Sequence, residues 1–172
     1  MGKVVLDTSV IVKAVLKPGK WLPRNVYERE VETHEKSRLS IRLVKEKRVE
    51  VFIPFVALVE IAGVLTRLSS SSLAKEVVES LKTSENYHIV YEEEIRDHAI
   101  NIALEIGSSG FDTYFIAVAK MFNAVLVTDD EPMALHAERL GIDTILIRRA
   151  SIEELTTKIS KLTKNRFSHV NS

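Results

Sequence analysis

Acidic residues in this sequence stand at positions where charge is costly. Asp7, Glu60 and Asp112 are each the only charged residue in an apolar stretch, and Asp129 and Asp130 directly follow the apolar run AVLVT. A carboxylate buried alone normally becomes protonated, pairs with a cation or binds a metal ion. Because no lysine or arginine interrupts these stretches, the pattern favours metal binding.

The chemistry of these side chains indicates which metal they would bind. Carboxylates without neighbouring histidine or cysteine suit hard cations, which predicts Mg²⁺ or Mn²⁺ as cofactor. Such ions leave coordination positions for water and a phosphate, lower the pKa of the bound water and neutralise charge on a leaving oxygen. The pattern is therefore typical of metal-dependent phosphodiester hydrolysis.

Each acid also has a simpler interpretation when it is considered alone. Asp7 and Asp112 stand where a helix N-cap is expected, and Glu60 fits a glutamate paired with a distant arginine. Asp129 and Asp130 fit a solvated turn. The occurrence of all of them together, at strand ends or within apolar stripes, favours the metal site.

Strands and helices alternate along the chain. Apolar runs bounded by turn residues predict strands at KVVL, VEVFIP, YHIVY, AVLVT and DTILI. The intervening segments are helical, and FVALVEIAGVLTRL is predicted to be buried on most sides. This alternation predicts an α/β fold, a three-layer α/β/α sandwich with a central parallel sheet. Such sheets bind ligands beyond the carboxyl ends of their strands, where Asp7 and the Asp129–Asp130 pair are expected.

Length and composition predict one domain. Of the 172 residues, 1–148 form the predicted domain proper, and 149–172 form a C-terminal helix and polar tail that belong to it. The net charge is +0, so any attraction to nucleic acid has to come from local charge. The chain has no cysteine, and it shows no signal peptide or bilayer-spanning run, so we expect a soluble cytoplasmic protein without membrane contact.

Four segments, in order, resemble the motifs of the PIN-domain nucleases, and among them the VapC-type toxins of toxin–antitoxin pairs. They are VVLDTSVIV, PFVALVEIAGVL, GFDTYFIAVA and AVLVTDDEP, and the resemblance extends from about residue 3 to residue 148. It implies that Asp7, Glu60 and Asp112 are catalytic metal ligands, with Asp130 as the fourth acid and Asp129 as an auxiliary candidate. The assignment between Asp129 and Asp130 stays open.

The resemblance also implies an activity and partners. It implies Mg²⁺- or Mn²⁺-dependent hydrolysis of RNA, a homodimer, and control by a small antitoxin protein. The hydroxyl groups of Thr8, Ser9 and Thr128 would orient the carboxylates or water. A housekeeping RNA-processing nuclease remains the near alternative, and a non-catalytic module that binds RNA or protein is the alternative from another class.

A basic stretch in the predicted second helix is a candidate for RNA contact. Its residues are Lys36, Arg38, Arg42 and Lys45. Phosphate contacts from such side chains would add salt-dependent affinity, although a solvated helix face is the default interpretation.

Two other enzyme classes are disfavoured. A haloacid-dehalogenase phosphatase needs a second aspartate where Ser9 stands, and nucleotide-binding enzymes need a glycine-rich phosphate loop.

Overall fold

Short runs rich in valine, isoleucine and leucine form the five strands of a parallel sheet. The computed structural model describes residues 2–107 and 110–164. The strands are β1 (Lys3–Leu6), β2 (Glu50–Pro54), β3 (Tyr87–Val90), β4 (Val125–Thr128) and β5 (Thr144–Leu146). Their order is β3-β2-β1-β4-β5, with every neighbouring pair parallel. The predicted central parallel sheet is confirmed.

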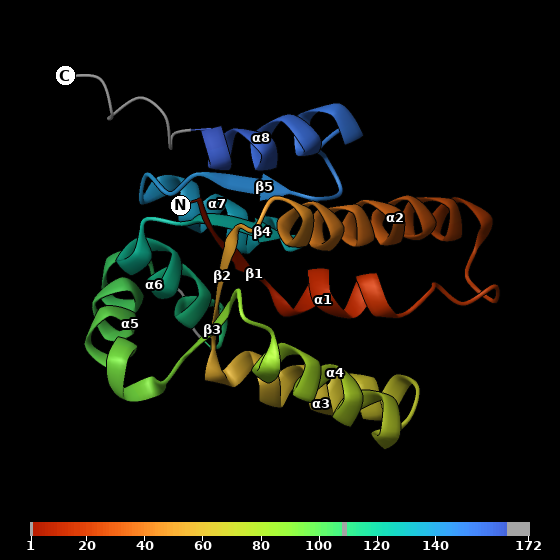
Figure 1. Ribbon diagram of the computed structural model, residues 1–172, viewed down its shortest axis with the longest axis horizontal. Helices are drawn as coiled ribbons and strands as arrows, with labels where there is room; N and C mark the ends of the chain where they lie inside the picture. Colours follow the sequence, from red (N-terminus) through yellow and green to blue (C-terminus); the bar gives the residue numbers. More distant parts are fainter. Residues whose placement is uncertain (1, 108–109, 165–172) are drawn as a thin grey trace.

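Helices connect the strands and cover the sheet (Figure 1). They are α1 (Thr8–Val15), α2 (Arg24–Glu46), α3 (Phe55–Leu68), α4 (Ser71–Thr83), α5 (Glu92–Ile106), α6 (Asp112–Phe122), α7 (Glu131–Arg139) and α8 (Ile152–Lys164). In Figure 1, α5 and α6 lie on one side of the sheet, α1 and α2 on the other, and α3 and α4 form a pair at one end. This arrangement confirms the α/β/α sandwich.

The strand order places a topological switch point at the centre of the sheet. The chain builds β1, β2 and β3 outward in one direction, and then returns to add β4 and β5 on the other side of β1. Connections on the two sides of β1 therefore diverge, and open sheets generally bind ligands beyond the carboxyl ends of the strands at such a point. Asp7 follows β1 and Asp129 follows β4, so both lie at this edge of the sheet.

Local signals explain where the helices at this edge begin and end. The Asp130 carboxylate accepts a hydrogen bond from the Met133 amide at 2.8 Å and caps α7. Helix α5 ends at Gly107, whose φ of 66° lies in the left-handed region that glycine adopts without steric cost. Pro54 ends β2 and precedes α3, because its ring cannot donate to a further ladder hydrogen bond.

The prediction that the helix of residues 55–68 is buried on most sides is wrong. Helix α3 packs against α4 and α1, and it leaves Phe55 and Val59 exposed to 45% and 57%. It buries Ile61 and Leu65 completely. An apolar composition alone does not determine how many faces of a helix pack against other elements.

The C-terminal helix α8 packs against α2 and buries Leu155 and Ile159. The predicted polar tail after residue 164 lies outside the described residues. Within the described residues, no helix is both long and apolar enough to cross a bilayer.

Candidate metal centre

Asp7 is the most deeply buried of the four predicted metal ligands. It is 4% exposed, and its carboxylate accepts hydrogen bonds from Ser9 and, at 2.8 Å, from the Thr128 hydroxyl. It occupies the N-cap position of α1, but its side chain makes no capping bond, so helix capping does not explain this carboxylate. Burial raises the pKa of Asp7 to about 6; hydrogen bonds from the Ser9 and Thr128 hydroxyl groups and from the Ser9 backbone oppose this rise, and the charge of Glu60 adds to it.

Glu60 of α3 lies near Asp7. Its Oε2 accepts a hydrogen bond of 2.7 Å from the hydroxyl of Thr8, the residue that follows Asp7. The two carboxylates also interact electrostatically, since the charge of Glu60 contributes to the raised pKa of Asp7. Thr8 therefore holds Glu60 beside Asp7, although the two acids are far apart in the sequence.

Asp112 and Asp130 extend this acidic group. Asp112 is the first residue of α6, whose N-cap is Phe111. Burial raises the pKa of Asp112, and the charges of Asp130 and Glu60 raise it further, whereas His136 lowers it. Asp112 is therefore within electrostatic range of both Asp130 and Glu60.

Asp129 has different partners from its neighbour Asp130. It is 2% exposed, and it pairs with Lys13 at 2.6 Å and with the Arg148 guanidinium at 3.0 and 3.1 Å. Burial opposes its ionisation, but the hydrogen bonds from Arg148 and Lys13 outweigh burial and hold the pKa of Asp129 below its ordinary value. The geometry thus engages Asp129 in ion pairs, whereas the Asp130 carboxylate accepts from the Met133 amide.

Three residues near these acids are not indicated by the sequence: Lys13, Arg148 and His136. Lys13 stands just beyond the apolar stretch around Asp7, and Arg148 follows the last strand. Neither Lys13 nor Arg148 belongs to a sequence motif, because only folding brings the two side chains to Asp129. His136 lies close enough to Asp112 to lower its pKa.

The chemistry of the cluster fits a hard divalent cation. Its donors are carboxylate oxygens, and the cationic Lys13 and Arg148 are engaged with Asp129. A cation would offset the burial and like-charge repulsion that raise the pKa values of Asp7 and Asp112. Among residues 2–107 and 110–164, no group of three or more Asp, Glu or His side chains lies close enough together to hold a metal ion.

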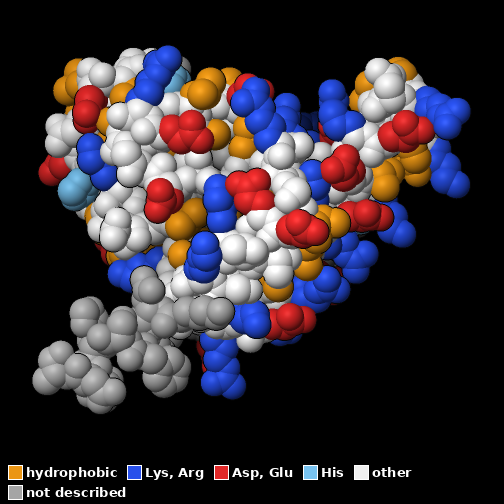
Figure 2. Space-filling model, turned by 90° about the horizontal axis from the view of Figure 1, so that it is seen from above, with side chains coloured by type: hydrophobic (Ala, Val, Ile, Leu, Met, Phe, Trp, Pro, Cys, Tyr) orange, Lys and Arg blue, Asp and Glu red, His pale blue; other side chains and the backbone are white. Residues whose placement is uncertain are grey.

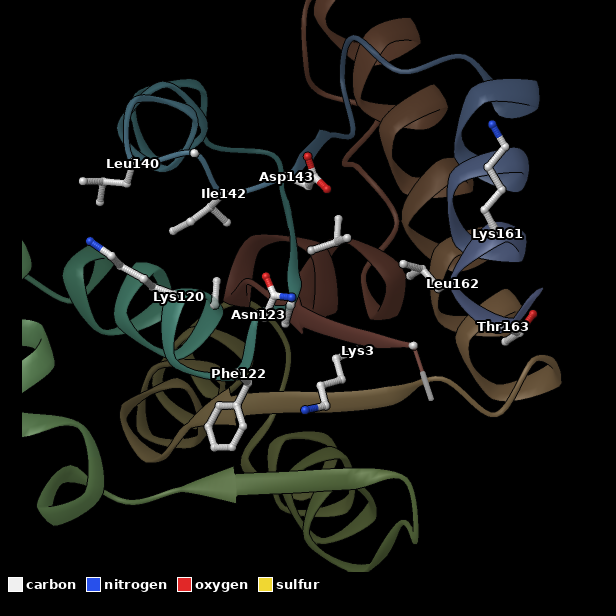
Figure 3. A pocket seen from close by; sticks show the side chains of 15 residues that line it. Lys3, Lys120, Phe122, Asn123, Leu140, Ile142, Asp143, Lys161, Leu162 and Thr163 are labelled. Carbon is white, nitrogen blue, oxygen red and sulfur yellow. The ribbon is translucent and has the colours of Figure 1, made fainter. Parts of the chain in front are cut away.

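A cavity of about 920 Å³ lies at the opposite edge of the sheet (Figure 3). It is lined by Lys3 at the start of β1, Asp143 just before β5, and Lys161 of α8. Carboxyl and amino ends of parallel strands lie at opposite edges, so this cavity is separate from the acidic cluster. It contains none of the predicted site residues.

The predicted RNA-contacting residues lie along α2, and the side chain of one of them is buried. Lys36 is 5% exposed and pairs with Glu32 at 2.6 Å, so the expectation that it contacts RNA is wrong. Arg38, Arg42 and Lys45 are exposed. Figure 2 shows lysine and arginine side chains gathered on the right of the molecule, the side along which α2 runs in Figure 1.

The fold is that of an α/β protein with a parallel sheet, and Asp7 and Asp129 follow the strands on either side of its switch point. The chain belongs to the PIN domain family, whose model matches residues 4–139. Members of this family are generally nucleases, so hydrolysis is the class of reaction to which the chain is assigned. Divalent metal ions are the usual cofactors of such nucleases.

Solved structures support the same fold. The crystal structure of FitAcB from Neisseria gonorrhoeae matches with a TM-score of 0.53 and 18% identity, over 86% of this chain and 99% of that chain. The structure of FitAB bound to the IR36 DNA fragment matches with a TM-score of 0.51 and 18% identity, over 86% and 97%. No curated protein sequence matches the chain significantly.

Proposed function

We propose that this protein is a metal-dependent endoribonuclease whose Mg²⁺ or Mn²⁺ ions are held by Asp7, Glu60, Asp112 and Asp130. One observation carries the proposal. Hydrogen bonds link acids from separate parts of the sequence: Thr8, next to Asp7, donates to Glu60 at 2.7 Å, and Thr128, two residues before Asp130, donates to Asp7 at 2.8 Å. Asp112 is within electrostatic range of Glu60 and Asp130. Carboxylates brought together without a paired cation favour a divalent ion over a purely structural role.

The residues around these acids would prepare them for the ion. The hydroxyl groups of Ser9 and Thr128 orient Asp7, and Thr8 orients Glu60. A bound divalent ion would lower the pKa of a coordinated water and neutralise charge on the phosphodiester. Asp130 has one oxygen engaged with the α7 amide of Met133, which fixes the side chain while the other oxygen remains for the ion.

The preferred biological version is a VapC-like toxin restrained by a small antitoxin in the cytoplasm. It is supported by the order of the four motifs and by the likeness in fold to FitAB, which in one structure is bound to a DNA fragment. We also propose a homodimer. The exposed apolar residues Phe55 and Val59 of α3 offer a surface that association would remove from water.

RNA contact by α2 remains a proposal for Arg38, Arg42 and Lys45. Glu30, in the first half of α2, pairs with Lys13 next to the centre. At 1.5 Å per residue, Arg38 to Lys45 lie roughly 12 to 22 Å farther along the helix axis. These side chains would therefore contact RNA that extends along α2, beyond the phosphate that is cleaved.

Cleavage of single-stranded and structured RNA with Mg²⁺, Mn²⁺ or chelator tests the proposed chemistry. Asp7→Asn and Asp112→Asn should abolish cation-dependent cleavage, because each removes a metal ligand. Asp143→Asn is the matched control, since this exposed aspartate lies at the opposite edge of the sheet. Equal chelator-resistant cleavage by wild type and Asp7→Asn would refute the metal mechanism, and failure to cleave any RNA while binding it would favour the non-catalytic module.

A housekeeping RNA-processing nuclease has the same chemistry and is the second candidate. The two differ in the consequence of producing the protein in cells. A toxin arrests growth in an Asp7-dependent manner, and a cognate antitoxin relieves the arrest, whereas a processing nuclease leaves growth unchanged.

A further inference from the structure

Asp129 is held by more donors than any acid of the metal centre. Its Oδ1 accepts from the Nε of Arg148 at 3.0 Å and from the Arg148 amide at 3.2 Å. Its Oδ2 accepts from the Nη2 of Arg148 at 3.1 Å and from Lys13 at 2.6 Å. A carboxylate has about four lone-pair sites, so these four donors leave none for a metal ion. We call this set of Lys13, Asp129 and Arg148 the Asp129 clamp.

The Asp129 clamp ties together elements that meet only at this edge of the sheet. Lys13 belongs to α1 and also pairs with Glu30 of α2 at 2.7 Å, and Arg148 follows β5. The amide of Asp129 donates to the hydroxyl of Ser9 at 3.2 Å, the same hydroxyl that donates to Asp7. The turn after β4 is thereby fixed to α1 and to the end of β5.

Both chain neighbours of Asp129 act at the metal centre. Thr128 donates to Asp7 at 2.8 Å, and the Asp130 amide donates to the Thr128 hydroxyl at 2.9 Å. A rotation of the turn would therefore move a hydrogen-bond donor of Asp7 and a proposed metal ligand at the same time. Asp129 itself is 2% exposed and cannot contact RNA directly. Its effect on the metal centre is therefore exerted through Thr128 and Asp130.

We infer that Asp129 is a positioning residue that binds no metal: the Asp129 clamp fixes the β4–α7 turn so that Thr128 donates to Asp7 and Asp130 stays near Asp112. This inference rests on the proposed metal-dependent function. It makes Lys13 and Arg148 determinants of metal affinity although neither contacts the ion. Loss of such outer contacts typically weakens metal binding or activity by roughly 10- to 100-fold.

The decisive variant is Arg148→Lys, which keeps the charge but loses the two-pronged contact with Asp129. Its matched control is Arg149→Lys, the same substitution at the next residue, where the guanidinium is 65% exposed and pairs with Glu131. Calorimetric titration of the full chain with Mn²⁺ alone should show affinity lowered about tenfold or more in Arg148→Lys and unchanged in Arg149→Lys. If Arg148→Lys does not fold, the same titration is made with Lys13→Arg, which also keeps the charge of the residue it changes.

Amide hydrogen exchange, measured by NMR without metal, gives a second readout. The amide of Asp130 should exchange faster in Arg148→Lys than in wild type or Arg149→Lys. Tighter Mn²⁺ binding by Arg148→Lys would overturn the inference, because a released carboxylate would then be acting as a ligand. Unchanged Mn²⁺ affinity would also overturn it, whether or not exchange accelerates. If Asp7→Asn binds Mn²⁺ as wild type does, the proposed function itself fails, and the exchange rates still report on the clamp.

Discussion

Replacing Asp7 by asparagine should change how the stability of the metal-free protein depends on pH. Burial raises the pKa of Asp7 from an ordinary value of 3.8 to about 6. Because the folded-state value is the higher one, the stability contributed by neutral Asp7 is fully present below about pH 3.8 and is lost as pH rises through about 6. Asparagine resembles the neutral acid at every pH and avoids this loss.

The size of the effect follows from the two pKa values. The step from 3.8 to about 6 is about two pH units, which corresponds to roughly 3 kcal/mol at about 1.4 kcal/mol per unit. Asp7→Asn also disturbs the hydrogen bonds from Ser9 and Thr128, but those are present at both ends of the pH range. The free energy of unfolding of Asp7→Asn, relative to wild type, should therefore rise by roughly 3 kcal/mol between pH 3.5 and pH 7.

Urea unfolding of both proteins in chelator, followed by circular dichroism across this range, measures the difference directly. The other titrating groups are the same in the two proteins, so their contributions largely cancel in the difference between the two free energies of unfolding. A difference that stays constant within about 1 kcal/mol, or that falls as pH rises, would refute the assignment of a raised pKa to Asp7. Mn²⁺ at a hundred times its dissociation constant should then stabilise wild type by about 2.7 kcal/mol and Asp7→Asn far less.

Other substitutions separate catalysis from stability. Glu60→Gln should remove cation-dependent RNA cleavage while leaving the circular dichroism spectrum unchanged; retained cleavage would remove Glu60 from the metal centre. Asp130→Asn should lower cleavage with little change in thermal stability, whereas Asp130→Ala should also lose about 0.5–2 kcal/mol because the cap to the α7 amide is lost. Phe115 is 1% exposed, so Phe115→Ala should cost about 3–5 kcal/mol in urea unfolding, and a cost below about 1 kcal/mol would contradict its place in the core.

Secondary structure and sheet type were predictable from the sequence because their signals are local. Apolar runs such as VVL and VLV specify strands buried on both faces, and Gly107 and Pro54 mark where neighbouring elements end. Alternation of strands and helices then restricts the fold to a parallel sheet covered by helices. The predicted sandwich was confirmed on these grounds.

The burial of individual faces and side chains was not predictable in the same way. Helix α3 is almost wholly apolar, yet Phe55 and Val59 remain exposed because only part of its surface meets α1 and α4. Lys36, expected at the surface, is buried and paired with Glu32. In both cases the outcome depends on which elements pack together, and a helical pattern does not contain that information.

The sequence by itself determined the four acids as candidates, because an isolated carboxylate in an apolar stretch requires a partner wherever the chain folds. It also placed Asp7, Asp129 and Asp130 at strand ends. Only the tertiary structure decided how the adjacent aspartates differ: Asp129 pairs with Lys13 and Arg148, whereas Asp130 caps α7. Charge pairing acts over a few ångströms in space, and those distances exist only after α1, β4 and the end of β5 have come together.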